Sequence, residues 1–575
     1  MNHGVLAPLM FGALIIFLLL GYPVAFSLSA VGLLFALIGI QAGLMPVELL
    51  QALPQQVFDI MRNETLMAIP FFTFMGLVLE RSGMAEDMLE TVGQLFGRVR
   101  GGLAYAVIFV GALLAATTGV VAASVISMGL ISLPIMLRYG YDKRLASGVI
   151  AASGTLAQII PPSLVLIVLA DQMSVSVGDM YKGAMVPGLL LVACYALFVF
   201  LVTIFKPAAA PALPPEARNL REPDGSNGLP SLLVVLALSV AVGWFAIGQI
   251  ADADTATDSK VVIGMGSATV AAWVIAFVHR LLRLKLMSSV AERVTFVLVP
   301  PLALIFVVLG TIYIGVATPT EGGAMGAVGA VIMAMLKRRL NLGLMRQAMD
   351  STLKLTTFVV FILIGARVFR IAFIGLEGDV WVEHLFDGLP GGVVGFLVVV
   401  NILIFVLAFF LDFFEISFII VPLLMPVAIK LGINPIWFGV MLGVNMQTSF
   451  LHPPFGFALF YLKSVAPKEI RSIDIYWGAV PFVLIQIVMV GAVIAFPELV
   501  THFLDKAPPA LENPSEMLER LQSDPTGPEG DSDSADLLRQ MGVDPATAPD
   551  PVSPATPEAP PAEDPAALLE QASKP

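Results

Sequence analysis

Charged residues are scarce in this chain, since only 13% of its 575 residues are Asp, Glu, Lys or Arg and 58% are hydrophobic. A soluble domain of ordinary composition has about 25% charged residues. Apolar runs such as Leu6 to Leu20 and Leu232 to Ile247 approach the length that a lipid bilayer requires. A large soluble protein would need polar faces between such runs, and the sequence lacks them. The composition therefore indicates an all-α polytopic membrane protein.

Cysteine and the common catalytic motifs are also missing. The one cysteine, Cys194, lies in an apolar run, which excludes a disulfide framework and a thiolate metal site. The chain has no phosphate-binding G-x-x-x-x-G-K-[ST] loop, no H-E-x-x-H pair and no G-x-S-x-G nucleophile motif. No basic surface interleaved with aromatic residues predicts nucleic-acid binding. We therefore expect neither an enzyme nor a bound cofactor.

The net charge of −12 is concentrated at the C-terminal end. From Thr501 to Pro575 the chain has 15 acidic residues, four basic residues and 14 prolines. A segment of this composition cannot bury enough apolar surface to offset the entropy lost on folding. We expect a disordered, acidic, proline-rich tail over residues 499–575.

The apolar periodicity predicts about 12 transmembrane segments. They lie near residues 5–21, 23–40, 65–80, 145–172, 183–205, 230–250, 261–279, 294–312, 318–336, 355–375, 435–463 and 476–497. Two further stretches, 101–137 and 393–431, are too long for one crossing and are interrupted by polar or acidic residues. Irregular backbone at membrane depth is tolerated where protein covers it or it lines a cavity. Both stretches are therefore predicted to be re-entrant hairpins.

The distribution of basic residues predicts the orientation. With these spans, 21 Lys and Arg residues fall on one side, and six fall on the other: Arg62, Lys182, Lys260, Arg367, Arg370 and Lys430. Loops rich in Lys and Arg mark the cytoplasmic side. We expect a multi-pass protein of the bacterial inner membrane whose N-terminus and C-terminal tail are periplasmic.

An internal repeat divides the chain. Pro134, Gly140 and the pair Pro161–Pro162 recur 292 residues later as Pro426, Gly432 and Pro453–Pro454. Five crossings per half would give the two halves opposite orientations, a recurring plan of secondary transporters. The sequence predicts a first inverted repeat at 1–205, a linker with two extra transmembrane segments at 206–293, and a second repeat at 294–498.

The Pro–Pro pairs predict two broken helices with exposed backbone carbonyls. Ser153 and Thr155 precede the first pair, whereas Ser449 and His452 precede the second. Carbonyls beside hydroxyls suit a small hard cation, and nearby helix N-termini favour a carboxylate. A proline kink with satisfied hydroxyls is the structural alternative.

The sequence predicts specific roles for two acidic residues and for one short motif. Asp412 and Glu415 are intramembrane carboxylates at the second hairpin tip, where ionisable groups are costly and usually functional. We expect Asp412 to accept backbone donors at this tip, with a position near a cation as the alternative. In Thr318–Glu321 the sequence TPTE predicts a helix start capped by Thr318.

Several segments resemble one transporter family. They include AIPFFTFMG, GRVRGGLAYA, TTGVVAAS and GTLAQIIPPS in the first half, and GVATPTEGGA, FLDFFEISFIIVP and VNMQTSFLHPPFG in the second. The chain resembles the large membrane (permease, DctM-type) subunit of tripartite ATP-independent periplasmic (TRAP) transporters over roughly residues 5–497, apart from an insertion at about 206–293. The resemblance implies a symporter that imports small organic acids by sodium-driven elevator motion.

The resemblance also implies partners and ligands. A periplasmic solute-binding protein (DctP-type) would deliver the solute, and a small four-helix membrane subunit (DctQ-type) would support the scaffold. Sodium would bind at two sites near the hairpin tips. The residues implied for the first site are Thr117, Thr118, Ser124, Ser153, Gly154 and Thr155. Those implied for the second are Asp412, Ser449 and His452, with Thr118, Gly154, Thr155 and Ser449 as the assigned sodium ligands.

Two departures from the family pattern affect these expectations. The family usually has threonine where this chain has His452, and a protonated imidazole would repel sodium. The first tip, TTGVVAAS, lacks the serine-rich run of many members. A C4-dicarboxylate is therefore not to be assumed, and the expected small organic acid is a monocarboxylate or a 2-oxo acid, with a C4-dicarboxylate kept as a further option. The alternative is a stand-alone ion or anion exchanger of the same broad architecture.

Overall fold

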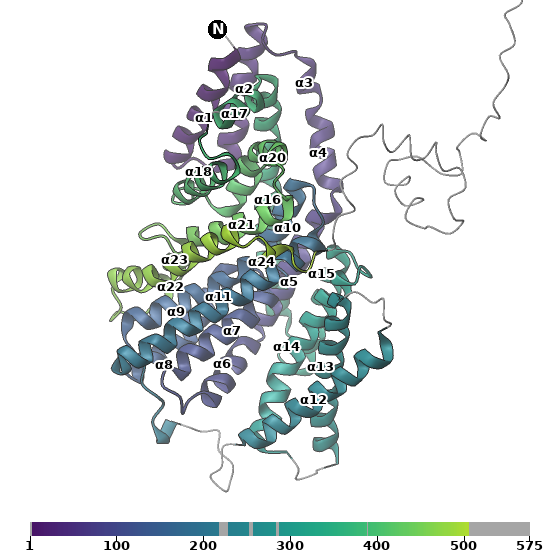
Figure 1. Ribbon diagram of the computed structural model, residues 1–575, viewed down its shortest axis with the longest axis vertical. Helices are drawn as coiled ribbons and strands as arrows, with labels where there is room; N and C mark the ends of the chain where they lie inside the picture. The colour runs from purple at the N-terminus through teal and green to yellow at the C-terminus, as the bar shows by residue number, and fades with distance from the viewer. Residues whose placement is uncertain (1–2, 218–227, 252–256, 283–286, 388, 505–575) are drawn as a thin grey trace, which may run out of the picture. The chain divides into compact units, whose positions relative to one another are not determined.

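A computed structural model describes residues 3–217, 228–251, 257–282, 287–387 and 389–504. Within these ranges the chain is helical and contains no β-strand, which confirms the predicted all-α class. Residues 505–575, which make up nearly all of the predicted disordered tail, lie outside the described ranges. Figure 1 shows the helices coloured along the chain.

The first half contains eleven α-helices and the 3₁₀ turn η1. They are α1 (His3–Leu19), α2 (Val24–Gln41), α3 (Glu48–Gln51), α4 (Leu53–Arg62), α5 (Glu64–Arg81), α6 (Met84–Leu95), α7 (Gly102–Thr118), α8 (Val121–Arg138), α9 (Lys143–Thr155), η1 (Leu156–Gln158), α10 (Leu164–Met173) and α11 (Val177–Phe205). The short turns η2 (Pro207–Ala209) and η3 (Pro215–Ala217) follow. The pair α7 and α8 occupies the position predicted for the first re-entrant hairpin.

The rest of the described chain also consists of helices joined by short connections. It comprises α12 (Leu229–Ile250), α13 (Thr257–Leu281), α14 (Ser289–Tyr313), α15 (Pro319–Leu336), α16 (Leu342–Gly375), α17 (Gly378–Asp387), α18 (Gly392–Leu407), α19 (Phe413–Glu415), the π-helical turn η4 (Ile416–Ile420), α20 (Val421–Lys430), α21 (Pro435–Gln447), η5 (Thr448–Phe450), α22 (Phe457–Val465), α23 (Ser472–Ala495) and α24 (Glu498–Thr501). The segments α18 and α19–η4–α20 stand where the second hairpin is predicted.

The 292-residue displacement found in the sequence also relates the ends of helices in the two halves. The helix α9 and the turn η1 both recur, with their starts and ends displaced by 292 residues, as α21 and η5. The segment 121–138 recurs in the same register as 413–430. Gly140 and Gly432 both have positive φ angles, and the Pro161–Pro162 and Pro453–Pro454 bonds are both cis. The sequence repeat is therefore a repeat of structure.

The two broken helices form the centre of the core. All residues from 145 to 170 are buried, and so are all residues from 437 to 452. A helix that is apolar on every side is expected in the interior rather than at a surface. Each break is closed locally: Thr155 Oγ1 donates to Ala152 O at 2.8 Å, and Ser449 Oγ donates to Met446 O at 2.6 Å. The breaks are thus covered by protein, as membrane depth requires.

Equivalent positions of the two halves meet at this centre. Gln447 Nε2 donates to Thr155 Oγ1 at 3.1 Å, and the two residues are 292 positions apart. Gln486 Nε2 also lies near Thr155 Oγ1, at 3.5 Å, and donates to the Tyr195 hydroxyl at 2.9 Å. Equivalent residues touch only near an axis that relates their repeats. The Thr155–Gln447 contact therefore marks a pseudo-two-fold axis.

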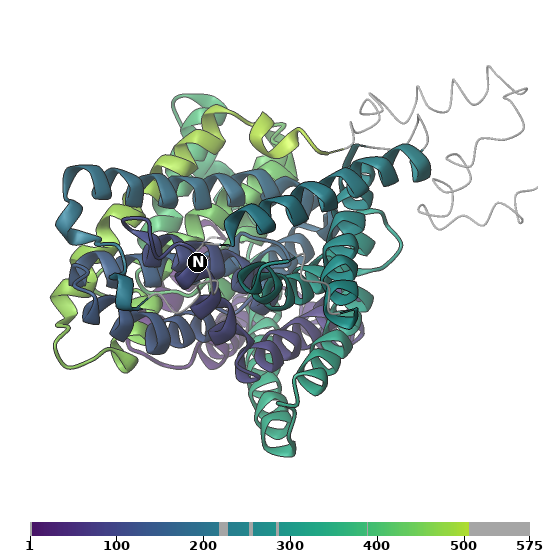
Figure 2. The same cartoon turned by 90° about the horizontal axis from the view of Figure 1, so that it is seen from below.

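Packing between the halves is reciprocal in the way that such an axis predicts. The helix α8 of the first hairpin packs against α22 of the second half. In the same way α20, the counterpart of α8, packs against α10, the counterpart of α22. Likewise α10 packs against α21 while α22 packs against α9. Outside this unit α2 packs against α16 and α5 packs against α15. The two extra helices α12 and α13 pack against each other and against α14, forming a group of their own in both views (Figures 1 and 2).

The membrane-spanning character is clear in the described residues. Ten helices are long and apolar enough to cross a bilayer, or eleven if the pair α5 and α6, bent by 60°, is counted as one span. Four of the 12 predicted spans are not among the ten: α1 and the halves of both broken helices are too short, and α5 is counted only together with α6. The hairpin segments Val121–Arg138 and Phe413–Lys430, by contrast, do qualify by length and composition.

Several shorter helices were not predicted. The helices α3, α4, α6 and α17 lie in segments that the apolar runs left unassigned, because each is short or carries acidic residues. The predicted helix start at Thr318 is confirmed. Thr318 Oγ1 accepts from Glu321 N at 3.2 Å, and the Glu321 carboxylate accepts from Thr318 N at 2.8 Å. This reciprocal pair satisfies two free donors at the start of α15.

The contact between α9 and α23 yields a stability prediction. A Cβ atom at Gly148 would clash with the carbonyl oxygen of Gly478, because the two backbones approach closely there. We expect Gly148→Val to lower the free energy of unfolding by about 1–3 kcal/mol through overpacking. Thermal unfolding in detergent measures this change. Gly248→Ala is the control, since Gly248 has no neighbour within 4 Å. Equal Tm values for the two variants would contradict the assigned contact.

Candidate functional site

A pocket of about 380 Å³ lies where the interrupted helices meet. Its wall comes from both hairpin breaks, both broken helices and α16. The lining residues are Gly119, Val120, Val121, Ala122, Gln158, Leu164, Val165, Leu355, Phe358, Phe410, Asp412, Phe413, Phe414, Glu415, Phe450, Phe457 and Tyr461. All four discontinuities that the sequence predicts therefore face one cavity.

Lining residues from the first half correspond to lining residues from the second half through the same 292-residue displacement. Val120 of the first break corresponds to Asp412 of the second, and Gln158 corresponds to Phe450. Both members of each pair line the pocket. The fold thus supplies a nearly symmetric cavity, and the amino acids make it chemically asymmetric, with its acidic groups on the wall from the second half.

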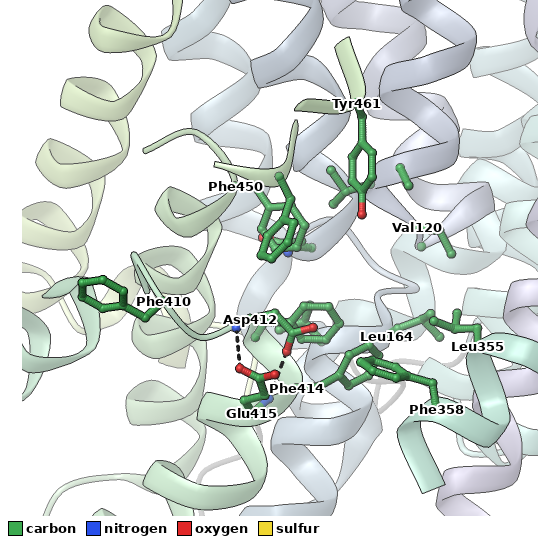
Figure 3. Close-up of a pocket in the computed structure, with 17 residues that line it drawn as sticks. Val120, Leu164, Leu355, Phe358, Phe410, Asp412, Phe414, Glu415, Phe450 and Tyr461 are labelled. Atoms are coloured by element: carbon green, nitrogen blue, oxygen red, sulfur yellow. Dashed lines mark hydrogen bonds between the residues drawn. The ribbon is translucent and has the colours of Figure 1, made fainter. Parts of the chain in front are cut away.

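Asp412 and Glu415 cap each other at the second hairpin break. Asp412 Oδ1 accepts from Glu415 N at 3.1 Å, and Glu415 Oε2 accepts from Asp412 N at 3.0 Å (Figure 3). This arrangement starts the short helix α19. The expectation that Asp412 accepts backbone donors at the tip is confirmed. Each carboxyl group keeps one further oxygen, so both can still act on a bound ion or solute.

The rest of the pocket is aromatic and lacks basic side chains. Among the described lining residues there are seven aromatic rings and no Arg, Lys or His. Tyr461 directs its hydroxyl into the space between Phe450 and Val120 (Figure 3). A negatively charged solute would therefore enter beside two carboxyl groups without a cationic side chain to neutralise it.

The first set of predicted cation residues gathers at the junction of α7, α8 and α9. Gly154 lies against Val125, the neighbour of Ser124, and Ser153 lies against Gly111 of α7. Ser153 is buried, and its hydroxyl has no hydrogen-bond partner in the described structure. The hydroxyl of Thr155 instead faces Gln447 at the pseudo-two-fold axis. The side chains of Thr117 and Thr118 lie outside the described part of the structure.

The second set is more dispersed. Asp412 lines the pocket, whereas Ser449 is buried one turn before His452. The imidazole of His452 packs between Phe405 and Phe409, with ring centroids 4.2 and 4.3 Å away. Neither of its ring nitrogens has a hydrogen-bond partner among the described residues. Of the seven predicted site residues whose side chains the structure describes, only Asp412 is among the residues that line the pocket.

Other lining residues were not singled out from the sequence. Gln158 sits within the segment GTLAQIIPPS, where an amide in a buried apolar run was the available signal. Leu355 and Phe358 come from α16. Their place in the wall depends on tertiary packing, so no local pattern in the sequence indicates it.

Comparison with known families identifies the chain. Residues 11–499 match the family described as the tripartite ATP-independent periplasmic transporter, DctM component. The chain belongs to this family. It is therefore the large permease subunit of a TRAP transporter and a multi-pass membrane protein, as its helices indicate.

Curated members of the DctM family differ in their stated solutes. The C4-dicarboxylate TRAP transporter large permease protein DctM of Pseudomonas aeruginosa is 29% identical, covering 78% of this chain and 88% of its own. The isethionate TRAP transporter permease protein DctMQ of Oleidesulfovibrio alaskensis is 25% identical, covering 81% and 62%. The ectoine/5-hydroxyectoine large permease protein UehC of Ruegeria pomeroyi is 24% identical, covering 87% and 99%. Family membership alone does not define the solute of this DctM chain.

The capping role of Asp412 yields a prediction. Asp412→Ala removes the acceptor for Glu415 N, so we expect the free energy of unfolding to fall by about 1 kcal/mol. Asp412→Asn retains an oxygen at the same place and should keep the wild-type Tm within error. Thermal unfolding of both variants in the same detergent measures the difference. Equal destabilisation by Asn and by Ala would show that the negative charge of Asp412, rather than its capping hydrogen bond, stabilises the hairpin tip.

Proposed function

We propose that this DctM subunit imports a small organic acid by sodium-coupled elevator transport. In the proposed complex a periplasmic solute-binding protein (DctP-type) delivers the solute, and a small four-helix membrane subunit (DctQ-type) supports the scaffold. The observation that carries the proposal is the pocket, in which both hairpin breaks and both broken helices meet. Secondary transporters bind solutes and coupling ions where discontinuous helices end near the midplane.

The charges of the pocket favour coupling to a cation. Two carboxyl groups line it, and none of the described lining residues is basic. An organic anion would therefore be repelled unless cations enter with it. Cotransported sodium supplies that positive charge. It also explains how a carrier whose described pocket residues include no arginine or lysine can take up acids.

We assign the proposed sodium ligands to both halves of the chain. In the first half they are Thr118, Gly154 and Thr155, with Thr117, Ser124 and Ser153 as further candidates. The unpartnered, buried hydroxyl of Ser153 fits a hard cation, which prefers oxygen ligands. In the second half they are Ser449, with Asp412 and His452. Asp412 has a carboxyl oxygen beyond the one used in capping.

The packing supports a moving unit built from both repeats. The hairpin arm α8 packs against α22, and α20 packs against α10, so each hairpin is attached to the broken helix of the other half. A displacement of one hairpin would therefore carry the opposite broken helix and the pocket wall with it. We propose that this unit moves against the helix pairs α2–α16 and α5–α15. In this arrangement the chain spans the bacterial inner membrane with a periplasmic N-terminus and tail.

Uptake into proteoliposomes tests the function. The vesicles hold this chain with its small subunit, and purified binding protein is present outside. We expect uptake to require both the binding protein and an inward sodium gradient, with Asp412→Asn reducing the rate at least about tenfold because a cation loses its charged partner. Uptake without binding protein would instead establish a stand-alone exchanger. Uptake that follows a proton gradient and ignores sodium would overturn the cation assignment.

A further inference from the structure

A crevice of about 680 Å³ lies at one end of the membrane-spanning helices α11 and α23. Its walls come from the C-terminal end of α11, the N-terminal ends of α9 and α23, and the turn η2. Among the residues that the structure describes, it shares no lining residue with the solute pocket. The crevice is therefore a second cavity, separate from the site described above.

Backbone contacts hold the walls of the crevice together. Asp142 N donates to Ala209 O at 2.9 Å, which ties the turn η2 to the start of α9. A Cβ atom at Gly478 would lie 2.2 Å from the carbonyl oxygen of Arg144, so the backbones of α9 and α23 are in contact there. The helix α23 also packs against α11 (Figure 1). The fold thus forms the crevice before any ligand binds.

The two acidic side chains in the lining already have partners. Asp142 Oδ1 caps α9 and accepts from Arg144 N at 2.9 Å. Asp474 Oδ2 lies 3.6 Å from Arg471 Nε in an ion pair at the start of α23. The charge of Asp474 is therefore balanced by a residue outside the crevice lining, and only Asp142 offsets the basic residues of the crevice.

Three basic residues line the same crevice, and their charges are not paired. Lys143 Nζ donates to the backbone carbonyl oxygen of Glu469 at 2.8 Å, an uncharged acceptor. The exposed side chains of Arg144 and Lys206 have no hydrogen-bond or ion-pair partner among the described residues. The crevice therefore has an excess of positive charge at one end.

Apolar side chains extend the crevice along the two helices. Phe198, Val202 and Lys206 follow one another at intervals of four residues, so they lie on one face at the end of α11. Trp477 and Pro481 have the same spacing on α23, and Trp477 is 55% exposed. Because both helices can cross a bilayer, the basic end lies at headgroup level and the apolar part at the level of the acyl chains.

This combination favours one class of ligand. Guanidinium and ammonium groups donate strong hydrogen bonds to phosphate oxygens. A soluble phosphate would leave the apolar part uncovered, and a choline headgroup would bring a second cation to an end that is already positive. Basic pockets between transmembrane helices on the cytoplasmic side bind anionic headgroups, and the distribution of Lys and Arg predicts that this end is cytoplasmic.

We propose that the crevice binds an anionic phospholipid, with Arg144 and Lys206 on its phosphate and an acyl chain along Val202 and Trp477. The site does not depend on which solute or which coupling ion the protein carries. Arg144 lies in the first turn of α9, and this broken helix also supplies Gln158 to the wall of the solute pocket. The lipid would therefore contact one of the helices that form the transport site.

Lipid binding to the purified complex tests the proposal. The chain and its small subunit are purified together in detergent and stripped of lipid. Dioleoyl phosphatidylglycerol or dioleoyl phosphatidylcholine is then titrated in, and native mass spectrometry measures the apparent Kd of the first bound lipid. The two lipids have identical chains and differ in headgroup charge. We expect phosphatidylglycerol to bind at least about tenfold more tightly.

Charge variants assign the binding to the crevice. We expect Arg144→Gln and Lys206→Gln each to weaken phosphatidylglycerol binding about fivefold, and the double variant about 25-fold. Arg144→Lys keeps the charge and should keep most of the affinity. The control Lys468→Gln removes one exposed charge from the loop between α22 and α23, outside the crevice lining, and should leave affinity unchanged. Because these side chains are exposed, the lipid-free Tm should stay within error.

Two further measurements separate a lipid from a soluble anion. Trp477→Ala should weaken phosphatidylglycerol binding about 2- to 10-fold, because an acyl chain loses apolar contact. Glycerol 3-phosphate, which has the phosphate without the chains, should not displace the lipid. Displacement at equal affinity would make the crevice a soluble-anion site and overturn the proposal. Equal Kd values for the two lipids, an unchanged Kd in the double variant, or an equal loss in Lys468→Gln would also overturn it.

Discussion

The broken helices α9–η1–α10 and α21–η5–α22 end inside the buried core, and most other features of the structure follow from this constraint. Backbone groups released at such ends need partners, because neither lipid nor apolar side chains can supply them. Local hydroxyl-to-carbonyl bonds at Thr155 and Ser449 satisfy part of the need. The contact between Thr155 and Gln447 then fixes the two breaks beside one axis. The hairpins of both halves pack around them, and the pocket lies where these interrupted segments meet.

The symmetry of this core contrasts with the asymmetry of the pocket chemistry. The backbone repeats over 292 residues with matching helix boundaries, yet Val120 faces the cavity where its counterpart is Asp412. Gln158 and Phe450 differ in the same way. A pseudo-two-fold scaffold can present related conformations of the pocket to the two sides of a membrane. Unequal side chains on its two walls allow one orientation of a polar, elongated solute to be preferred.

Much of the fold follows from the sequence because membrane helices leave strong local signals. The length of the apolar runs predicts the spans, and the Pro–Pro pairs predict the breaks in two helices. The repeated prolines and glycines predict the 292-residue displacement between the two halves. The helices α4 and α6 were missed because they are short and partly polar. The capping role of Asp412 could be predicted from its place at the tip. Gln158 and Phe358 could not be assigned to the pocket, since their place in its wall depends on how distant segments pack. The assigned sodium ligands stay predictions, and among the predicted site residues whose side chains the structure describes only Asp412 lines the cavity.

Site-directed labelling tests whether solute and sodium bind together between the two hairpin breaks. The single native cysteine, Cys194, is replaced by serine, and Val120→Cys places one thiol in the pocket wall. The rate of its reaction with a membrane-impermeant maleimide is then measured in the purified complex. We expect solute to slow labelling in sodium buffer, and to slow it much less when potassium replaces sodium. Labelling that is equally fast with and without solute in sodium buffer would contradict it.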